Sequence, residues 1–449
     1  MEDWFQAEQR VEQAQKLYES GDYVKAAQEL RSAIAVNPYN SSWHFNLALT
    51  LDALGEYEDA LVAYRRALEL EPEDVEVLNG LGVDYTRLGR YASALECFEQ
   101  VQKLEPRYEP SYCNRIVTYT EMGDHEAAET MFYLARQIKE ECPLCLYNIA
   151  NSLFDRGQYR KAIACWQRTL VLDAEHPQVN SRIAEAYWAM GELAKAKEHF
   201  LLQLRQEPGD VETLLDLGEL QADMGEFDEA SEKFRRILEQ EPEHTGAHFA
   251  LGELAFKRGE LERAEKQFRL VMRLDRHYPQ AHQKLGEVML RQGRLTQAGV
   301  HLLAELRQTG QEPHGLLELG QLLLEARKVR QANAVFRRLV ALEPDNASAE
   351  HSLAVSHFLM HDLDEGIRHC RRALRLRPDY PLALYNLALA HMQKGQMPRA
   401  RRYASKAVLA APGDSNIRQL AGKLGVAGMW VRLASRLSGL WRRLRRRGE

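Results

Sequence analysis

The sequence lacks long apolar runs and the common enzyme signatures. No stretch of about 18 or more apolar residues occurs, so we expect no transmembrane helix. The motifs G-x-x-x-x-G-K-[ST], H-E-x-x-H and G-x-S-x-G are missing, which argues against the common nucleotide, zinc-protease and serine-hydrolase chemistries. The N-terminal residues 1–5 do not combine a basic segment with an apolar one, so we expect no secretory signal and a cytoplasmic protein.

Cysteine is scarce, with 6 in 449 residues, and five of the six lie between Cys97 and Cys165. Cys142 and Cys145 form a C-x-x-C pair, a spacing that can bind metal or exchange disulfides. A structural zinc site needs four ligands, and the sequence has no second C-x-x-C. Burial in helical packing is the interpretation that we favour, and we expect no metal, cofactor or catalytic site.

The net charge of −6 is unevenly distributed along the chain. Residues 1–210 carry a net charge of −14, residues 211–414 are neutral, and residues 415–449 carry +8. This uneven distribution of charge along the chain is more informative about binding partners than the net charge of the whole chain. We expect the basic C-terminal segment to have a role different from that of the acidic body.

The chain repeats every 34 residues from Ala7 to Asp414, without an insertion or deletion. Glycine marks one column in ten repeats, and alanine follows five residues later, with Gly366 as the exception in that column. A fixed period of this length is typical of stacked helix pairs. After a lead-in at 1–6, the twelve repeats span 7–40, 41–74, 75–108, 109–142, 143–176, 177–210, 211–244, 245–278, 279–312, 313–346, 347–380 and 381–414.

Within one repeat the apolar residues predict two amphipathic helices. In 41–74, Leu47, Leu51 and Leu54 have helical spacing before Gly55, and a second stripe that contains Tyr64 follows. A column of small residues faces a column of bulky ones sixteen residues later, which predicts close packing of the two helices. The pattern therefore predicts an all-α fold of stacked helix pairs.

This pattern resembles the tetratricopeptide repeat (TPR). A small residue, a glycine seven residues on, an alanine five further, an aromatic residue four beyond and a late proline recur in register. The resemblance implies an α-solenoid, a right-handed superhelix of helix-turn-helix units whose first helices line a concave groove. Members of the family are typically scaffolds that hold peptides or helices, so we expect protein partners and no small-molecule substrate.

The family pattern places a set of first-helix residues on the groove. Inter-repeat packing is the alternative role for the aromatic members, and the recurring glutamates either attract a basic ligand or form a solvated strip. The set contains Phe45, Leu49, Asn79, Tyr147, Asn151, Phe154, Glu185, Trp188, Glu219, Phe249, Glu253, Phe256, Glu287, Phe358 and Tyr385.

The patterns of two specialised TPR subfamilies match this sequence less well than the general repeat pattern does. The carboxylate clamp of cochaperones needs a lysine and an asparagine where this chain has Val11 and Gln15. The asparagine ladder of the repeat arm of O-GlcNAc transferases is only partly present, and a glycosyltransferase domain is missing. The residues that match this ladder are Asn46, Asn114, Asn148 and Asn386.

Histidines gather where the turn glycine is lost, in repeats 10 and 11. Arg327 and His361 replace that glycine, and His357 and His361 have the i, i+4 spacing of a metal pair on a helix. The family pattern, however, puts His357 inside and His361 in the turn. We therefore expect packing and surface roles for them.

After the last repeat we expect a capping helix at 415–426 and a basic amphipathic helix at 427–449. Tryptophan and leucine on one face with arginine on the other can lie in an anionic membrane interface. Packing on the array or on a partner, autoinhibition of the groove and nucleic-acid binding are alternatives, the last the least favoured. The residues concerned are Trp430, Arg432, Leu433, Arg436, Leu437, Trp441, Arg442, Arg443, Arg445 and Arg446.

Together these patterns predict a non-enzymatic scaffold that binds peptide or helical segments in its groove and is tethered peripherally to a membrane by its C-terminal helix. The alternative is a regulatory or recruiting subunit of an enzyme complex, such as a glycosyltransferase.

Overall fold

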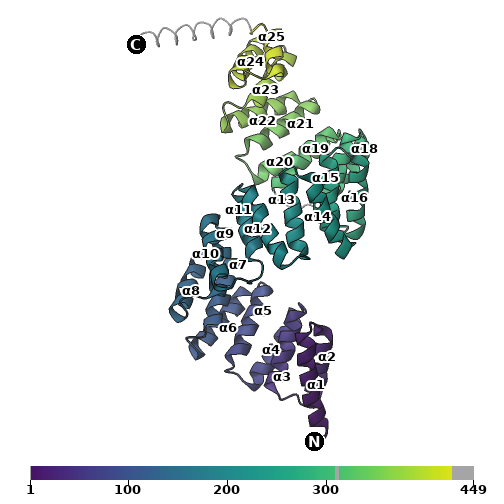
Figure 1. The fold of residues 1–449 in the computed structure, drawn as a ribbon. Helices are drawn as coiled ribbons and strands as arrows, with labels where there is room; N and C mark the ends of the chain where they lie inside the picture. The colour runs from purple at the N-terminus through teal and green to yellow at the C-terminus, as the bar shows by residue number, and fades with distance from the viewer. Residues whose placement is uncertain (1, 309–312, 427–449) are drawn as a thin grey trace. The chain divides into compact units, whose positions relative to one another are not determined.

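The computed structural model describes residues 2–308 and 313–426, and the predicted basic helix at 427–449 lies outside the described residues. The described part contains 25 helices and no strand (Figure 1). In chain order the helices are α1 (Glu2–Glu19), α2 (Tyr23–Val36), α3 (Ser41–Ala53), α4 (Tyr57–Leu70), α5 (Val75–Arg87), α6 (Tyr91–Leu104), α7 (Glu109–Glu121), α8 (His125–Ile138), α9 (Pro143–Asp155), α10 (Tyr159–Leu172), α11 (Val179–Ala189), α12 (Leu193–Gln206), α13 (Val211–Asp223), α14 (Phe227–Gln240), α15 (Thr245–Lys257), α16 (Leu261–Leu274), α17 (Ala281–Arg291), α18 (Leu295–Gln308), α19 (Pro313–Glu325), α20 (Val329–Leu342), α21 (Ala347–Leu359), α22 (Leu363–Leu376), α23 (Pro381–Gln393), α24 (Met397–Ala410) and α25 (Ser415–Lys423).

The helices form two compact units, Met1–Glu226 and Phe227–Glu449. Within each unit a helix with an odd number packs on the next helix of its own repeat, as α3 does on α4. The second helix then packs on the first helix of the following repeat, and successive first helices such as α7 and α9 also touch. This serial stacking confirms the predicted all-α α-solenoid fold.

Short polar residues and glycine set the ends of the helices. The carboxylate of Asp74 accepts hydrogen bonds from the amides of Glu76 and Val77, which caps α5. Between the helices of one repeat, the ten turn glycines have φ between 69° and 81°, the left-handed region that glycine adopts without strain. Arg327 and His361, which replace that glycine, have φ of 58° and 62°. The turn geometry is therefore kept where its usual residue is lost.

Small residues on the first helix face aromatic rings on the second. A β-carbon added to Gly82 would lie 2.6 Å from the ring of Phe98, and one added to Gly320 would lie 2.4 Å from the ring of Phe336. Both rings are fully buried. These contacts confirm the predicted packing of the small column against the bulky column, which fills the space between the helices.

The last described helix covers the end of the array. Ile417, Leu420 and Leu424 are buried against α23 and α24. The guanidinium of Arg401 donates a hydrogen bond to the carbonyl oxygen of Leu424 at 3.0 Å, which satisfies one C-terminal carbonyl of α25. Among the described residues, no helix has the length and apolar character needed to cross a membrane.

Candidate functional site

All of the predicted groove residues lie on first helices, and their side chains are half-buried except that of Glu219, which is exposed. Five of the aromatic members, Phe45, Tyr147, Phe154, Trp188 and Phe249, also contact aromatic rings inside the array. The ring of Phe154 lies 6.0 Å from that of Trp166, and the ring of Phe249 lies 5.4 Å from that of Phe268. These residues therefore contribute to the packing between helices while part of each side chain faces outward.

A cavity of about 170 Å³ opens among α7, α9, α10 and α11. It brings together Asn151 and Phe154 of the predicted set with Trp166 and Arg182. Its full lining is Val117, Thr120, Glu121, Asn148, Asn151, Phe154, Asp155, Trp166 and Arg182. We refer to these residues as the α9 pocket.

Two polar atoms of the α9 pocket have no hydrogen-bond partner among the described residues. They are the side-chain oxygen Oδ1 of Asn151 and the indole nitrogen Nε1 of Trp166, both shielded from solvent. A buried polar group without a partner costs about 1–3 kcal/mol, so most such groups in proteins are satisfied. Neither atom is exposed to solvent, and the Trp166 side chain is fully buried, so an incoming molecule would reach this acceptor and donor only after the wall of the α9 pocket opens. Sequence reasoning identified Asn151 but not Trp166, because the indole occupies a column that otherwise serves packing.

A second cavity, of about 240 Å³, lies between α1, α2 and α3. Its walls are mainly apolar and include Val11, Leu30 and Leu49. Val11 stands where the carboxylate clamp would need a lysine, and Gln15 stands in place of its asparagine. This cavity suits an apolar side chain better than a carboxylate.

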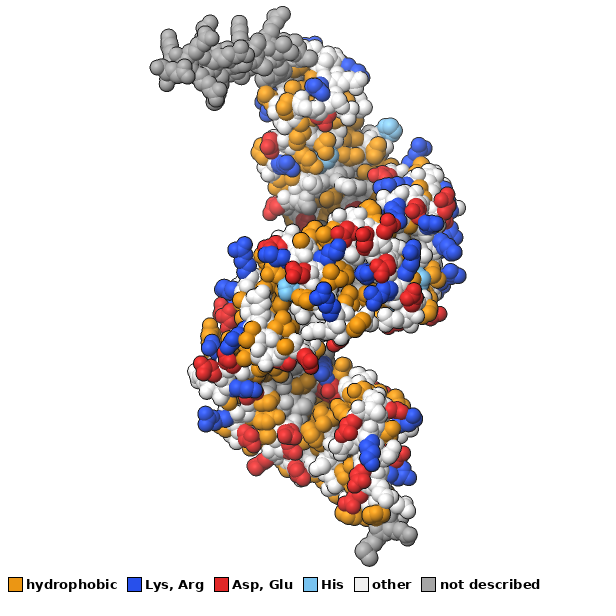
Figure 2. Space-filling view, in the orientation of Figure 1, with side chains coloured by type: hydrophobic (Ala, Val, Ile, Leu, Met, Phe, Trp, Pro, Cys, Tyr) orange, Lys and Arg blue, Asp and Glu red, His pale blue; other side chains and the backbone are white. Residues whose placement is uncertain are grey.

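The predicted glutamate column is partly neutralised by basic neighbours. In the N-terminal unit, Arg182 lies 3.0 Å from the carboxylate of Glu185. In the C-terminal unit, the ammonium of Lys284 lies 3.2 Å from Glu253 and 3.9 Å from Glu287. Acidic and basic side chains are likewise intermixed over the surface of α14–α18 in Figure 2. The column is therefore not a uniformly negative strip.

The residues that neutralise the column occupy the positions of the asparagine ladder. Arg182 and Lys284 fall in the same 34-residue column as Asn114. Burial and the nearby Glu185 and Glu219 raise the pKa of another member of this column, Asp216, to about 7. The sequence column of the partial asparagine ladder therefore contains the charged residues Arg182, Asp216 and Lys284, and it was the feature from which they could have been identified.

Three of the four ladder asparagines, Asn114, Asn148 and Asn386, bind the preceding repeat. Asn114 donates to Oδ1 of Asn79 at 3.0 Å, and Asn148 donates to the carbonyl oxygen of Cys113 at 3.2 Å. Their amides therefore stabilise the junctions between repeats and are already engaged.

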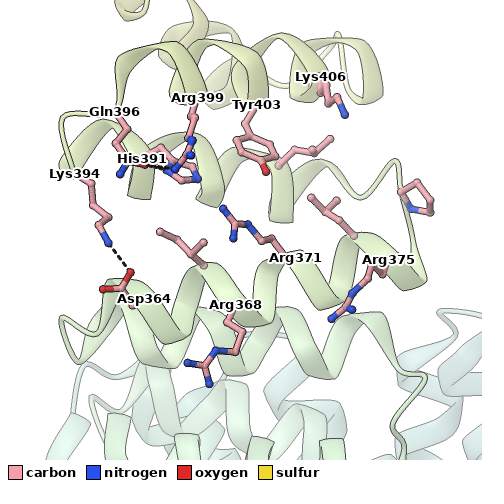
Figure 3. A pocket seen from close by; sticks show the side chains of 14 residues that line it. Asp364, Arg368, Arg371, Arg375, His391, Lys394, Gln396, Arg399, Tyr403 and Lys406 are labelled. Atoms are coloured by element: carbon pink, nitrogen blue, oxygen red, sulfur yellow. Dashed lines mark hydrogen bonds and ion pairs between the residues drawn. The ribbon is translucent and has the colours of Figure 1, made fainter.

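A larger cavity of about 870 Å³ lies between α22 and α24, beside α23 (Figure 3). Asp364 is the acidic residue in its lining, and it forms an ion pair of 2.5 Å with Lys394. His391 stacks on Tyr403 at the wall, and burial lowers the pKa of His391 below its ordinary value. The basic residues that line the cavity are Arg368, Arg371, Arg375, Lys394, Arg399 and Lys406, and we call this surface the basic cavity.

The paired histidines of repeat 11 do not come together as ligands. His357 is buried and stacks on His369 with ring centroids 5.4 Å apart, whereas His361 is exposed in the turn. The packing role expected for His357 therefore agrees with the structure.

Several solved structures are similar to the chain at low identity. The yeast protein Tom70 is 15% identical with a TM-score of 0.41, and the match covers 95% of this chain and 96% of that one. A tetratricopeptide repeat protein from Parabacteroides merdae is 18% identical with a TM-score of 0.41, covering 63% of this chain and 99% of that one. A thermophilic TPR protein from Thermus thermophilus is 25% identical with a TM-score of 0.39, covering 41% and 100%. No curated protein matches the chain.

Family models match the sequence over more than half of its length. Models described as tetratricopeptide repeat match residues 41–74, 75–108, 177–210, 215–279, 317–381 and 357–424, and one described as TPR repeat matches residues 150–191. Proteins of this family generally bind other proteins or peptides and are generally not enzymes, which supports a role as a protein-interaction scaffold. The chain belongs to the tetratricopeptide repeat family.

Proposed function

We propose that this scaffold binds an extended peptide segment across the first helices of its N-terminal unit, with the α9 pocket as the main contact. The observation that carries the proposal is the unpartnered pair of Asn151 Oδ1 and Trp166 Nε1. A peptide backbone offers both an N–H donor and a carbonyl acceptor at each residue other than proline. A bound peptide therefore carries the donor and the acceptor that these two atoms lack, and it would pair with them after a local opening of the pocket wall.

The surroundings of the pair support a peptide rather than a small polar ligand. Phe154 and Val117 provide apolar wall, and Arg182, which pairs with Glu185, also lines the cavity. The apolar cavity that contains Leu49 lies between the first helices α1 and α3 of the same unit, with Leu30 of α2 also in its wall. Extended peptides bind repeat surfaces through such separated side-chain pockets.

The test starts from peptides selected on the full chain from a random displayed library. The affinity of a selected peptide is then measured on the wild type, on Asn151→Leu and on Trp166→Phe. Loss of one hydrogen bond of about 1.4 kcal/mol corresponds to tenfold weaker binding, so we expect about tenfold for each variant. Gln167→Leu on the exposed face of α10 is the matched control and should bind as the wild type does.

Unchanged affinity in both pocket variants, with cross-links from the peptide to second helices, would contradict the proposal. Failure to select any peptide that competes for this surface would contradict it as well.

A specific observation favours the basic cavity as a second contact surface, for an acidic peptide segment. Six cationic side chains share this cavity with one carboxylate, which already pairs with Lys394. We expect a polyglutamate peptide to bind, and Arg371→Glu to weaken that binding by at least about tenfold. Arg330→Glu, an exposed change on α20, is the control. Binding that is insensitive to Arg371→Glu would remove this surface from the proposal.

The tether is proposed from the sequence alone. Trp430 and Trp441 alternate with arginines at the spacing of an amphipathic helix. Full-length protein should sediment with vesicles that contain anionic lipid and should not do so with neutral vesicles. A chain that ends at Gly428 should stay in the supernatant, and equal sedimentation of the two chains would contradict the tether.

A further inference from the structure

Four potential metal ligands converge where repeat 4 meets repeat 5. Glu109 begins α7, Cys113 lies one turn further, Cys142 precedes α9 and Cys145 lies in the first turn of α9. Their ligand atoms all lie within 4.8 Å of one another, and the three cysteines are buried. Cys113 and Cys145 are joined by a disulfide in the structure, with α-carbons 5.1 Å apart.

We propose that, when this disulfide is reduced, Glu109, Cys113, Cys142 and Cys145 bind one thiophilic divalent cation, with zinc as the expected metal. The metal-bound state and the disulfide exclude each other, because both use the sulfurs of Cys113 and Cys145. Four protein ligands leave no open position, so the site is structural rather than catalytic.

Three of the six distances between ligand atoms are close to those of a tetrahedral site, and the sulfurs of Cys113 and Cys145 must move apart on reduction. With metal–sulfur bonds of about 2.3 Å and a metal–oxygen bond of about 2.1 Å, tetrahedral geometry places two sulfurs about 3.8 Å apart and a sulfur and an oxygen about 3.6 Å apart. The sulfurs of Cys113 and Cys142 are 3.8 Å apart. Oε1 of Glu109 lies 3.2 Å from the sulfur of Cys113 and 3.4 Å from that of Cys145.

The repeat itself shows that the two cysteines stand in place of larger groups. In repeat 5 the equivalent residues Tyr147 and His176 stack with ring centroids 4.7 Å apart. The equivalent pairs are also aromatic in two repeats of the C-terminal unit, Phe249 with Tyr278 and His351 with Tyr380, with ring centroids 5.0 Å apart in both. Cys113 and Cys142 have the same separation of 29 residues. The two small side chains leave room for an ion at a junction that two rings fill in three other repeats.

The environment fits a metal thiolate. The backbone amide of Cys145 donates to the sulfur of Cys142 at 3.3 Å, a hydrogen bond that stabilises a thiolate at the start of a helix. Buried apolar residues that include Tyr112 and Ile149 pack around the cluster. A shell of this kind keeps water from competing for the metal.

Reduction of the disulfide and binding of the cation are two successive steps. A dithiol reductant exchanges with the Cys113–Cys145 bond, becomes a disulfide itself, and passes its two thiol protons to the two released sulfurs. A phosphine gives the same two thiols: it is oxidised to the phosphine oxide, and one water molecule supplies the oxygen and the two protons. The cation then displaces the protons of the three thiols, which leave to the buffer, and Glu109 binds as the carboxylate.

The test uses the full chain, reduced with a phosphine that does not compete for the metal, and titrated with Co²⁺. We expect one cobalt per chain, with the thiolate charge-transfer bands and visible absorption of tetrahedral cobalt, and displacement of cobalt by Zn²⁺. Cys142→Ser should weaken binding more than about 100-fold, because it removes a direct ligand and even outer-shell changes cost 10–100-fold. Glu109→Gln should weaken binding while leaving the thiolate bands.

Cys97→Ser is the matched control, since Cys97 is also buried in the N-terminal unit but is outside the cluster. It should bind cobalt as the wild type does. Absence of stoichiometric tetrahedral cobalt from the reduced wild type would overturn the proposal, even if the variants fold poorly. Equal binding by Cys113→Ser, Cys142→Ser and the wild type would overturn it too. Circular dichroism of each variant confirms that it is helical.

Discussion

The phenyl ring of Phe358 occupies the space in which a β-carbon of residue 366 would lie. A β-carbon added to Gly366 would stand 2.3 Å from Cε1 of this ring and 2.8 Å from Cζ. Every other repeat has alanine in the column of Gly366. The exception in the sequence is thus explained by a contact with a first-helix aromatic residue of the same repeat.

Gly366→Ala should destabilise the protein, although alanine is the usual residue of this column. In an unobstructed helix the change would stabilise by about 1 kcal/mol. Here the half-buried ring, which is packed against the core of the repeat, must move, which we expect to outweigh that gain and to leave a net loss of about 1–3 kcal/mol. Thermal unfolding followed by circular dichroism measures the change.

Two further variants test the cause. Gly299→Ala is the same substitution in α18, where the nearest atoms belong to the flexible side chain of Lys328, and it should be neutral or stabilising. Phe358→Leu combined with Gly366→Ala should recover part of the loss. Equal effects of Gly366→Ala and Gly299→Ala on the melting temperature would show that the ring of Phe358 does not cause the loss of stability.

His361→Gly should raise the melting temperature. His361 is exposed, with φ of 62°, a conformation that costs a residue other than glycine about 1–2 kcal/mol. Because glycine also gains entropy in the unfolded chain, we expect a net gain of about 0.5–1 kcal/mol. The reciprocal change Gly395→His, at φ of 69° in repeat 12, should lower stability. A melting temperature that is unchanged or lower in His361→Gly would contradict the proposal that the backbone of His361 is strained.

Ala264→Trp should disrupt the packing of α16. Ala264 is fully buried and belongs to the cluster of Phe268 and Leu285. The added indole should cost at least about 1–3 kcal/mol by overpacking. Glu262→Trp, on the exposed side of the same helix, is the control for the indole itself and should change the melting temperature little. Similar melts of both variants would refute the packing account.

The repeat period predicted the helices and their packing because every column serves the same contact in each repeat. It could equally predict that Asn151 and Phe154 lie near each other, since they share one face of one helix. Trp166 was missed because its column is a packing column throughout the chain. The free indole nitrogen results from the side chains around it and not from its own position in the repeat.

The cysteine cluster shows a second limit of the sequence. Cys142 and Cys145 were visible as a motif, whereas Cys113 is 29 residues away and Glu109 carries no motif at all. Only the stacking of α7 on α9 brings the four together. Other repeats have aromatic residues at the two positions equivalent to Cys113 and Cys142. These two positions are spatial neighbours in every repeat, so the repeat pattern already implied that Cys113 and Cys142 lie close together.

A last prediction concerns Asp84 on α5, whose side chain is fully buried. One of its carboxylate oxygens has no hydrogen-bond partner among the described residues, and Arg87, at 3.5 Å from the other, also pairs with Asp52. Burial raises the pKa of Asp84 to about 7. The folded chain therefore holds this proton more tightly than the unfolded chain, in which the pKa of aspartate is about 3.9.

Because the pKa of Asp84 is higher in the folded chain than in the unfolded chain, ionisation of Asp84 lowers the free energy of unfolding. Asp84 costs no stability below about pH 4, costs progressively more as the pH rises to about 7, and adds no further cost above it. Since Arg87 offsets part of the penalty, we expect Asp84→Asn to be more stable than the wild type by about 1–3 kcal/mol at pH 8. At pH 4 the two should melt alike. Asp59→Asn, an exposed change on α4, should show no such pH-dependent difference. If Asp84→Asn is less stable than the wild type at pH 8, the carboxylate is stabilised by Arg87 and its pKa is not raised.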